Sequence, residues 1–183
     1  MKAILFPVYE TKVSEEYASY LTSILPSSCS GLTVLSESML SQKRELLDVL
    51  KSMDDDLLLI SADNLPTWGP LQLIEKSVNH KTRALTHRPK DGFASDWIVG
   101  GGEILATDRT QLIESEGNAI SGGVAVIALE DQGNLEPFIS SSEDQYSNDA
   151  YRSGFHQIVD YLVRTKNIRS IDCKGFEAIK YVH

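Results

Sequence analysis

The sequence predicts an α/β fold in which a Rossmann-like, mainly parallel sheet is flanked by helices. The run 57–60 is apolar without polar alternation, which is typical of a strand buried on both faces. Strand-like and helix-like segments alternate over the first 86 residues, and this order indicates βαβ units with right-handed crossovers. Glycines interrupt the apolar segments of the second half, which predicts a mixed arrangement of strands there.

The first half is expected to alternate strands and helices. Ser14 opens the first helix together with two glutamates, and Pro26 stops it. Ser41 is expected to cap the second helix, whose apolar residues lie on one broad face. Pro70 suits the first turn of the third helix. The expected strands are 3–8, 32–35, 57–61 and 83–86, and the expected helices are 14–25, 42–53 and 71–78.

The second half contains apolar segments punctuated by glycine. Gly100, Gly101 and Gly102 let the backbone approach a ligand or form a bulge. They lie too late in the chain for a dinucleotide fingerprint, which follows the first strand. At 183 residues, the chain 1–183 fits a single domain with halves 1–88 and 89–183. The expected elements are strands at 97–106, 120–129, 168–172 and 178–182, a turn at 131–133, and a helix from Ser142 to about Lys166.

Composition and charge restrict the class of function. The formal net charge of -9 disfavours a broad nucleic-acid interface, which needs clustered Lys and Arg. No apolar run approaches the roughly 20 residues of a transmembrane helix. Cys29 and Cys173 have no metal-ligand spacing and are too few for a disulfide framework, so we expect a cytoplasmic protein. The oligomeric state is left open.

An acid follows the buried strand directly. The chain continues from the strand as Ser61, Ala62, Asp63 and Asn64. Because parallel sheets bind ligands just beyond the carboxyl ends of their strands, Asp63 is well placed to hold a metal ion or a hydroxyl group. Alternatively, Asp63 and Asn64 only make the turn out of the strand.

An acidic pair, Glu143 and Asp144, forms the first turn of the last predicted helix. One of these carboxylates is expected to act as a general base on an acceptor hydroxyl, or the pair simply caps the helix. His183 ends the chain, and the apolar residues before it suggest that the terminus is tied to the sheet. Serine-hydrolase, P-loop and zinc-protease motifs do not occur, so hydrolase and P-loop functions have no support.

Taken in order, these segments resemble the GT-A fold of nucleotide-sugar-dependent glycosyltransferases. The first strand is similar to the family's opening strand, which ends in a proline-containing loop against the nucleotide base, here at Pro7. The segment that ends in Asp63 looks like the family's Asp-x-Asp motif, whose final acid coordinates a divalent cation, Mn²⁺ or Mg²⁺. Ser61 stands where the motif has its first acid.

The resemblance implies a glycosyltransferase that moves a sugar from a nucleotide-sugar donor to an acceptor hydroxyl. Residues 1–88 would form the nucleotide-binding half and 89–183 the acceptor-side half. Asp63 and His183 would bind the metal ion, and Asp144 or Glu143 would be the catalytic base of an inverting reaction. The implied nucleotide-binding residues are Pro7, Tyr9, Arg44, Ser61, Asp63, Gly101 and Gly102.

Two other functions stay open from the sequence. One is a non-catalytic binding or assembly module on an α/β scaffold, since Ser61 would mark lost metal chemistry and fold does not imply function. The other is a different nucleotide-dependent transferase that uses the same strand ends.

Overall fold

An eight-stranded sheet forms the centre of the computed structural model, which describes residues 1–7, 13–36, 39–62, 66, 68–76, 81–88, 97–107, 117–141 and 154–173. Its strands are β1 (Lys2–Phe6), β2 (Leu32–Val34), β3 (Leu57–Ser61), β4 (Arg83–His87), β5 (Ile98–Gly100), β6 (Glu103–Ala106), β7 (Ile120–Ile127) and β8 (Ile168–Asp172). The helices are α1 (Glu15–Ile24), α2 (Met39–Ser52), α3 (Trp68–Lys76), α4 (Leu129–Gln132), α5 (Leu135–Ser141) and α6 (Gly154–Thr165).

The strands are hydrogen-bonded in the order β2-β1-β3-β7-β4-β8-β6-β5. β1 runs parallel to β2 and β3, and β4 runs parallel to β8. β7 is antiparallel to both β3 and β4, and β6 is antiparallel to β5 and β8. Among the described strands, therefore, only β6 and β7 run against the common direction. The predicted fold class is confirmed, with the antiparallel strands in the second half.

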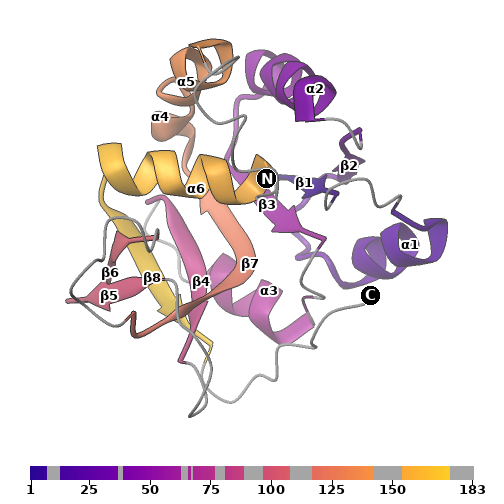
Figure 1. Cartoon of the computed structure of the whole chain (residues 1–183). Helices are drawn as coiled ribbons and strands as arrows, with labels where there is room; N and C mark the ends of the chain where they lie inside the picture. Colours follow the sequence, from indigo (N-terminus) through magenta and orange to yellow (C-terminus); the bar gives the residue numbers. More distant parts are fainter. Residues whose placement is uncertain are drawn as a thin grey trace.

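Helices cover both faces of the sheet (Figure 1). Ile4 and Phe6 of β1 pack in a core with α2, α5 and α6, whereas Leu5 packs on the opposite face with α1 and α3. The run 57–60 in β3 alternates between the same two cores, and all four side chains are 0% exposed. The prediction of a strand buried on both faces is confirmed.

The helix starts show which local signals determine the structure. Ser14 caps α1, because its side chain accepts a hydrogen bond of 3.1 Å from the backbone N–H of Tyr17. The predicted start of α2 is wrong, since α2 begins at Met39 and Ser41 lies inside it. Glu45 of α2 accepts a hydrogen bond of 2.9 Å from the backbone N–H of Ser36, which ties the helix to the end of β2.

The predicted turn at 131–133 is replaced by α4 and a short turn, and α5 was not predicted. A seven-residue helix such as α5 is too short for a helical period to be read in the sequence. α6 is described from Gly154 to Thr165, inside the long helix expected from Ser142. Residues 142–153 and the predicted strand 178–182 lie outside the described residues.

Glycines allow two close backbone arrangements in the second half. Gly101 and Gly102 form the turn between β5 and β6 with φ of 62° and 82°, which glycine adopts readily in a two-residue hairpin. Gly122 of β7 lies against Leu85 of β4, where a Cβ atom would come within 2.6 Å of the Leu85 Cβ. The β4–β7 register shifts at this point, between Ala84 and Thr86. In the part of the chain that is described, no helix has both the length and the apolar character that a membrane crossing requires.

Candidate functional site

The carboxyl ends of β1, β2, β3, β4 and β8 lie along one edge of the sheet, since these strands share one direction. Such an edge is where open α/β sheets bind ligands. α2 follows β2 and α6 precedes β8, so both helices begin at this edge as well. The candidate site is therefore built from strand ends together with the first turns of two helices.

Two of the predicted nucleotide-binding residues are neighbours at this edge. Pro7 directly follows β1, and Ser61 ends β3 in register with Phe6. Ser61 is 0% exposed, so it is buried within the sheet. Tyr9 and Asp63, the other predicted residues of these two loops, lie outside the described residues.

A pocket opens beside the end of β1, between α2, α5 and α6. It encloses about 290 Å³, counting the part that is open to solvent. Most of its walls are apolar, as in small-molecule sites, and a few polar side chains enter it. On the α5 side, Phe138 stacks on Tyr161 of α6 with ring centroids 4.4 Å apart. The pocket is lined by Phe6, Gln42, Lys43, Leu46, Phe138, Ile139, Gly154, Gln157 and Ile158.

Gln42 is the most unusual residue of the pocket. Its side chain is 2% exposed, yet its Oε1 has no hydrogen-bond partner among the described residues. Gly154, the first described residue of α6, packs closely against it, because a Cβ atom there would lie 2.9 Å from Oε1. A buried carbonyl without a donor costs about 1–3 kcal/mol of stability. The pocket therefore contains an acceptor that lacks a donor.

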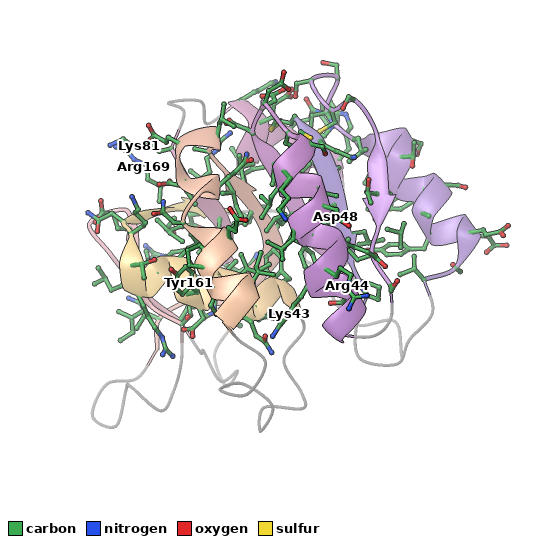
Figure 2. The ribbon with its side chains drawn as sticks, turned by 90° about the horizontal axis from the view of Figure 1, so that it is seen from above. Lys43, Arg44, Asp48, Lys81, Tyr161 and Arg169 are labelled. Carbon is green, nitrogen blue, oxygen red and sulfur yellow. The ribbon has the colours of Figure 1, made fainter. Side chains whose placement is uncertain are left out.

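The adjacent residues Lys43 and Arg44 lie on different sides of α2. Lys43 lines the pocket and lies on the side of α2 that faces α5, whereas Arg44 is drawn on the other side of the helix (Figure 2). Arg44, which was predicted to bind nucleotide, is exposed and does not line this pocket. Arg44 is two residues from Gln42, which places it about 200° around the helix axis, so it faces away from the pocket that Gln42 lines.

Farther along the same edge, polar side chains link the ends of β4 and β8. The Thr86 and Ser170 hydroxyl groups are hydrogen-bonded at 2.7 Å. Nε of Arg88 lies 3.7 Å from Oδ2 of Asp172 in an ion pair. Burial lowers the pKa of His87, and the nearby Asp172 carboxylate offsets part of that change. Asp172 was not predicted as a site residue, although it carries the same signal as Asp63, an acid at the end of a strand.

The metal ligands proposed from the sequence, Asp63 and His183, lie outside the described residues. Within the described ranges, no group of three or more His, Cys, Asp or Glu side chains could hold a metal ion. The Asp172 carboxylate is already paired with a guanidinium group. The described residues alone do not fit a metal centre. The predicted bases Glu143 and Asp144 also lie outside them.

Gly101 and Gly102 lie far from the other predicted residues. Their turn joins β5 to β6, and the sheet order places β7, β4 and β8 between β6 and β3. At about 4.8 Å per strand, this corresponds to roughly 19 Å between β6 and β3. The structure thus brings Pro7 and Ser61 together but does not bring these glycines to them.

Comparisons with known proteins identify the fold. No protein-family model and no curated protein matches the chain. The structure of CMP:2-keto-3-deoxy-manno-octonic acid synthetase complexed with CTP is similar with a TM-score of 0.63 at 10% identity, over 94% of this chain and 90% of that one. The structure of the inositol-1-phosphate CTP transferase from T. maritima has a TM-score of 0.57 at 13% identity, over 94% of this chain and 85% of that one. The structure of UDP-glucose pyrophosphorylase complexed with UDP-glucose has a TM-score of 0.57 at 10% identity, over 99% of this chain and 92% of that one.

Identities this low establish the fold alone. The predicted GT-A-like nucleotide-binding fold is confirmed. These similar structures are nucleotidyltransferases, so the comparison does not point to glycosyl transfer specifically.

Proposed function

We propose that this chain is a nucleotide-dependent transferase that joins the nucleotidyl group of a nucleoside triphosphate to a sugar phosphate or a sugar acid. The observation that carries the proposal is the extent of the structural likeness. Nucleotidyltransferases match 94–99% of this chain, and 85–92% of their own length is covered. The likeness therefore includes both the carboxyl edge of the sheet and the later half of the fold.

The proposed donor is a pyrimidine nucleotide. Two of the three similar structures have CTP in their names, and the third has UDP-glucose. At the carboxyl edge the chain has an apolar pocket, which is also lined by two buried amide side chains, Gln42 and Gln157, and by Lys43.

The reaction follows from the chemistry of phosphoryl groups. An acceptor oxygen attacks the α-phosphorus and forms a new P–O bond, the bond from the α-phosphorus to the bridging oxygen breaks, and pyrophosphate leaves. When the acceptor is a hydroxyl group, its proton passes to a base, for which Glu143 and Asp144 stay the proposed residues; the oxygen of a phosphate dianion attacks without losing a proton. Catalysis of this kind depends mainly on positioning and charge stabilisation, and the Lys43 ammonium group supplies positive charge. Asp63 and His183 stay the proposed ligands of a divalent cation, Mn²⁺ or Mg²⁺.

Glycosyl transfer, which the sequence resemblance implied, is the second candidate. What supports it is the resemblance of the segment ending in Asp63 to the metal-binding motif of the GT-A glycosyltransferases. The two reactions release different products. Nucleotidyl transfer releases pyrophosphate, whereas glycosyl transfer releases a nucleoside diphosphate.

The test measures both products with purified protein. Each of CTP, UTP, dTTP, ATP and GTP is supplied with a panel of sugar phosphates and sugar acids, and UDP-, GDP- and dTDP-sugars are supplied in parallel with acceptor sugars. Pyrophosphate release with a pyrimidine triphosphate supports the proposal. Nucleoside diphosphate release without pyrophosphate supports glycosyl transfer. If no product forms and calorimetry detects no nucleotide binding, the chain is a binding module of another kind.

A matched pair of lysine variants localises the activity. Lys43→Met removes the charge at the pocket and should raise KM for the triphosphate by about tenfold, because a charge-assisted contact contributes about 1.5–3 kcal/mol. Lys81→Met removes an exposed charge at the amino end of β4, far from Lys43 (Figure 2). It should leave KM within about twofold of the wild-type value.

A further inference from the structure

We propose that Arg88 and Asp172 bind the acceptor of the reaction, which is a sugar with an oxyanion, a phosphate or a carboxylate, next to a hydroxyl group. The inference rests on the proposed function, because it assumes a second substrate beside the nucleotide, and it adds the residues that hold this substrate. It begins from β4 and β8, which are neighbours in the sheet and end at the same edge (Figure 1).

The ends of β4 and β8 carry polar side chains on one face. Ala84 of β4 and Ile168 of β8 belong to the core on the α6 side of the sheet. Thr86 and Ser170 follow two residues later on the same strands, and side chains two residues apart on a strand share a face. Their hydroxyl groups are hydrogen-bonded to each other at 2.7 Å, as this arrangement requires. The face that is apolar inside the sheet therefore becomes polar toward the carboxyl edge.

Arg88 and Asp172 extend this polar face toward solvent. Nε of Arg88 lies 3.7 Å from Oδ2 of Asp172, and the two side chains are 77% and 34% exposed. This separation is longer than a hydrogen bond, so the ion pair leaves the guanidinium N–H groups available to a ligand. A guanidinium group has five N–H donors in a plane, which match two oxygens of a carboxylate or a phosphate. Arg88 can therefore bind an oxyanion while the Asp172 charge keeps its side chain at this edge.

The Asp172 carboxylate determines what lies next to the oxyanion. An ionised carboxylate only accepts hydrogen bonds, so it repels a second anion and binds a hydroxyl group. Arg88 and Asp172 together present donors beside an acceptor, which is the complement of an oxyanion beside a hydroxyl group. Sugar phosphates and sugar acids have this combination, whereas a neutral sugar lacks the oxyanion. The pair therefore favours the charged sugars that the proposed function requires as acceptors.

The position of the pair along the edge leaves space for both substrates. The pocket with Lys43, which supplies charge for the triphosphate in the proposed function, lies beside the end of β1. The sheet order places β7 between β3 and β4, so the ends of β3 and β4 lie roughly 10 Å apart at about 4.8 Å per strand. The end of β8 is one strand farther. An acceptor at β4 and β8 would therefore lie beside the nucleotide on the same edge.

Two arginine variants test the proposal. Arg88→Gln removes the guanidinium group at the carboxyl edge. The control, Arg169→Gln, removes an exposed guanidinium group from the same pair of strands near their amino ends, where Arg169 is drawn beside Lys81 (Figure 2). Arg169 is in register with Arg83, and Arg83 precedes Arg88 by five residues, so the two sites are roughly 17 Å apart at about 3.3 Å per residue.

Binding is measured by calorimetry with a non-hydrolysable CTP analogue present. The charged probes are glucose 1-phosphate, inositol 1-phosphate and gluconate, and the neutral probes are glucose and inositol. The wild type should bind a charged probe about tenfold or more tightly than its neutral counterpart, and Arg88→Gln should lose about that factor. Arg169→Gln should bind as the wild type does, and both variants should keep the affinity for the CTP analogue within about twofold. Whether the phosphates or the acid bind more tightly identifies the oxyanion.

The role of Asp172 is tested with the charged probe that binds most tightly and with its analogue that lacks the hydroxyl group next to the oxyanion. The wild type should bind the complete probe about tenfold more tightly than the deoxy analogue, because a hydrogen bond to a charged group is lost. Asp172→Asn keeps the shape of the side chain and should reduce this difference to about twofold or less. If Asp172→Asn discriminates as the wild type does, the role of Asp172 is refuted.

Contrary results separate this inference from the proposed function. If Arg88→Gln binds the charged probes as the wild type does, or if the wild type binds them no better than the neutral probes, the inference is refuted and nucleotide binding still supports the proposed function. If Arg88→Gln also loses affinity for the CTP analogue and unfolds at a lower urea concentration than Arg169→Gln, Arg88 is a structural residue and the inference fails. If the wild type binds no nucleotide at all, both proposals fail.

Discussion

Replacing Gly122 with alanine should force β7 away from β4 at the centre of the sheet. The new Cβ would lie 2.6 Å from the Leu85 Cβ and 3.1 Å from the Leu85 carbonyl oxygen. Carbon atoms in contact are ordinarily about 3.5–4.0 Å apart, so the strands must separate by roughly 1 Å. The obstacle includes backbone atoms of a residue that is 1% exposed, and a side-chain rotation cannot relieve it.

The cost can be worked out from this geometry. Overpacking of a dense core costs about 1–3 kcal/mol, and loss of one hydrogen bond of the β4–β7 ladder adds about 1 kcal/mol. Gly122→Ala should therefore lower the free energy of unfolding by about 2–4 kcal/mol. With a urea m-value of about 2 kcal/mol/M, the unfolding midpoint should fall by roughly 1–2 M.

Urea unfolding of Gly122→Ala is compared with Gly133→Ala. Gly133 follows α4 with φ of -59°, and a Cβ atom there would meet nothing within 4 Å. Alanine at position 133 should raise stability by about 0.4–1 kcal/mol, because it restricts the unfolded chain. If both variants have the wild-type midpoint, the close approach of β7 to β4 is wrong, and so is the placement of β7 between β3 and β4.

Three further predictions concern single side chains. Burial lowers the pKa of His87 from its ordinary 6.5, so the unfolded chain binds a proton more readily than the folded protein. The free energy of unfolding should therefore fall as the pH drops below about 6.5. His87→Gln should reduce this pH dependence in urea unfolding between about pH 7 and pH 5. Burial raises the pKa of the Cys173 thiol to about 12, so at pH 8 a disulfide reagent should label this thiol only as fast as the protein unfolds. Rapid labelling of the native protein would contradict the burial of Cys173. The Thr107 hydroxyl donates a hydrogen bond of 2.5 Å to the buried Asp160 carboxylate. Thr107→Val should therefore lower the free energy of unfolding in urea by about 1.5–3 kcal/mol. Thr22→Val, at an exposed position, should change it by no more than about 0.5 kcal/mol.

The sheet was predictable where burial alone defines a strand. The run 57–60 was predicted as a strand buried on both faces. All four of its residues lie in β3, and their side chains are buried. The direction of β7 was not predictable, because an apolar run has the same pattern in either orientation. Its antiparallel placement depends on pairing with β3 and β4, which are distant in sequence.

The candidate site was predictable only as a region. The carboxyl edge followed from the βαβ order, and Pro7 and Ser61 lie there as neighbours. Which of Lys43 and Arg44 lines the pocket depends on how α2 is rotated about its axis. That rotation is determined by the packing of α5 and α6 against α2. Gln42 could not be singled out from the sequence either, because a buried acceptor without a partner is recognised only when its surroundings are known.

The most direct test is a crystal structure of the wild-type protein with a non-hydrolysable analogue of CTP or UTP. The proposed function predicts that the nucleotide lies across the carboxyl ends of β1 and β3, with its phosphates toward Lys43. A nucleotide bound at the amino ends of the strands, or at the β5–β6 turn, would contradict the account.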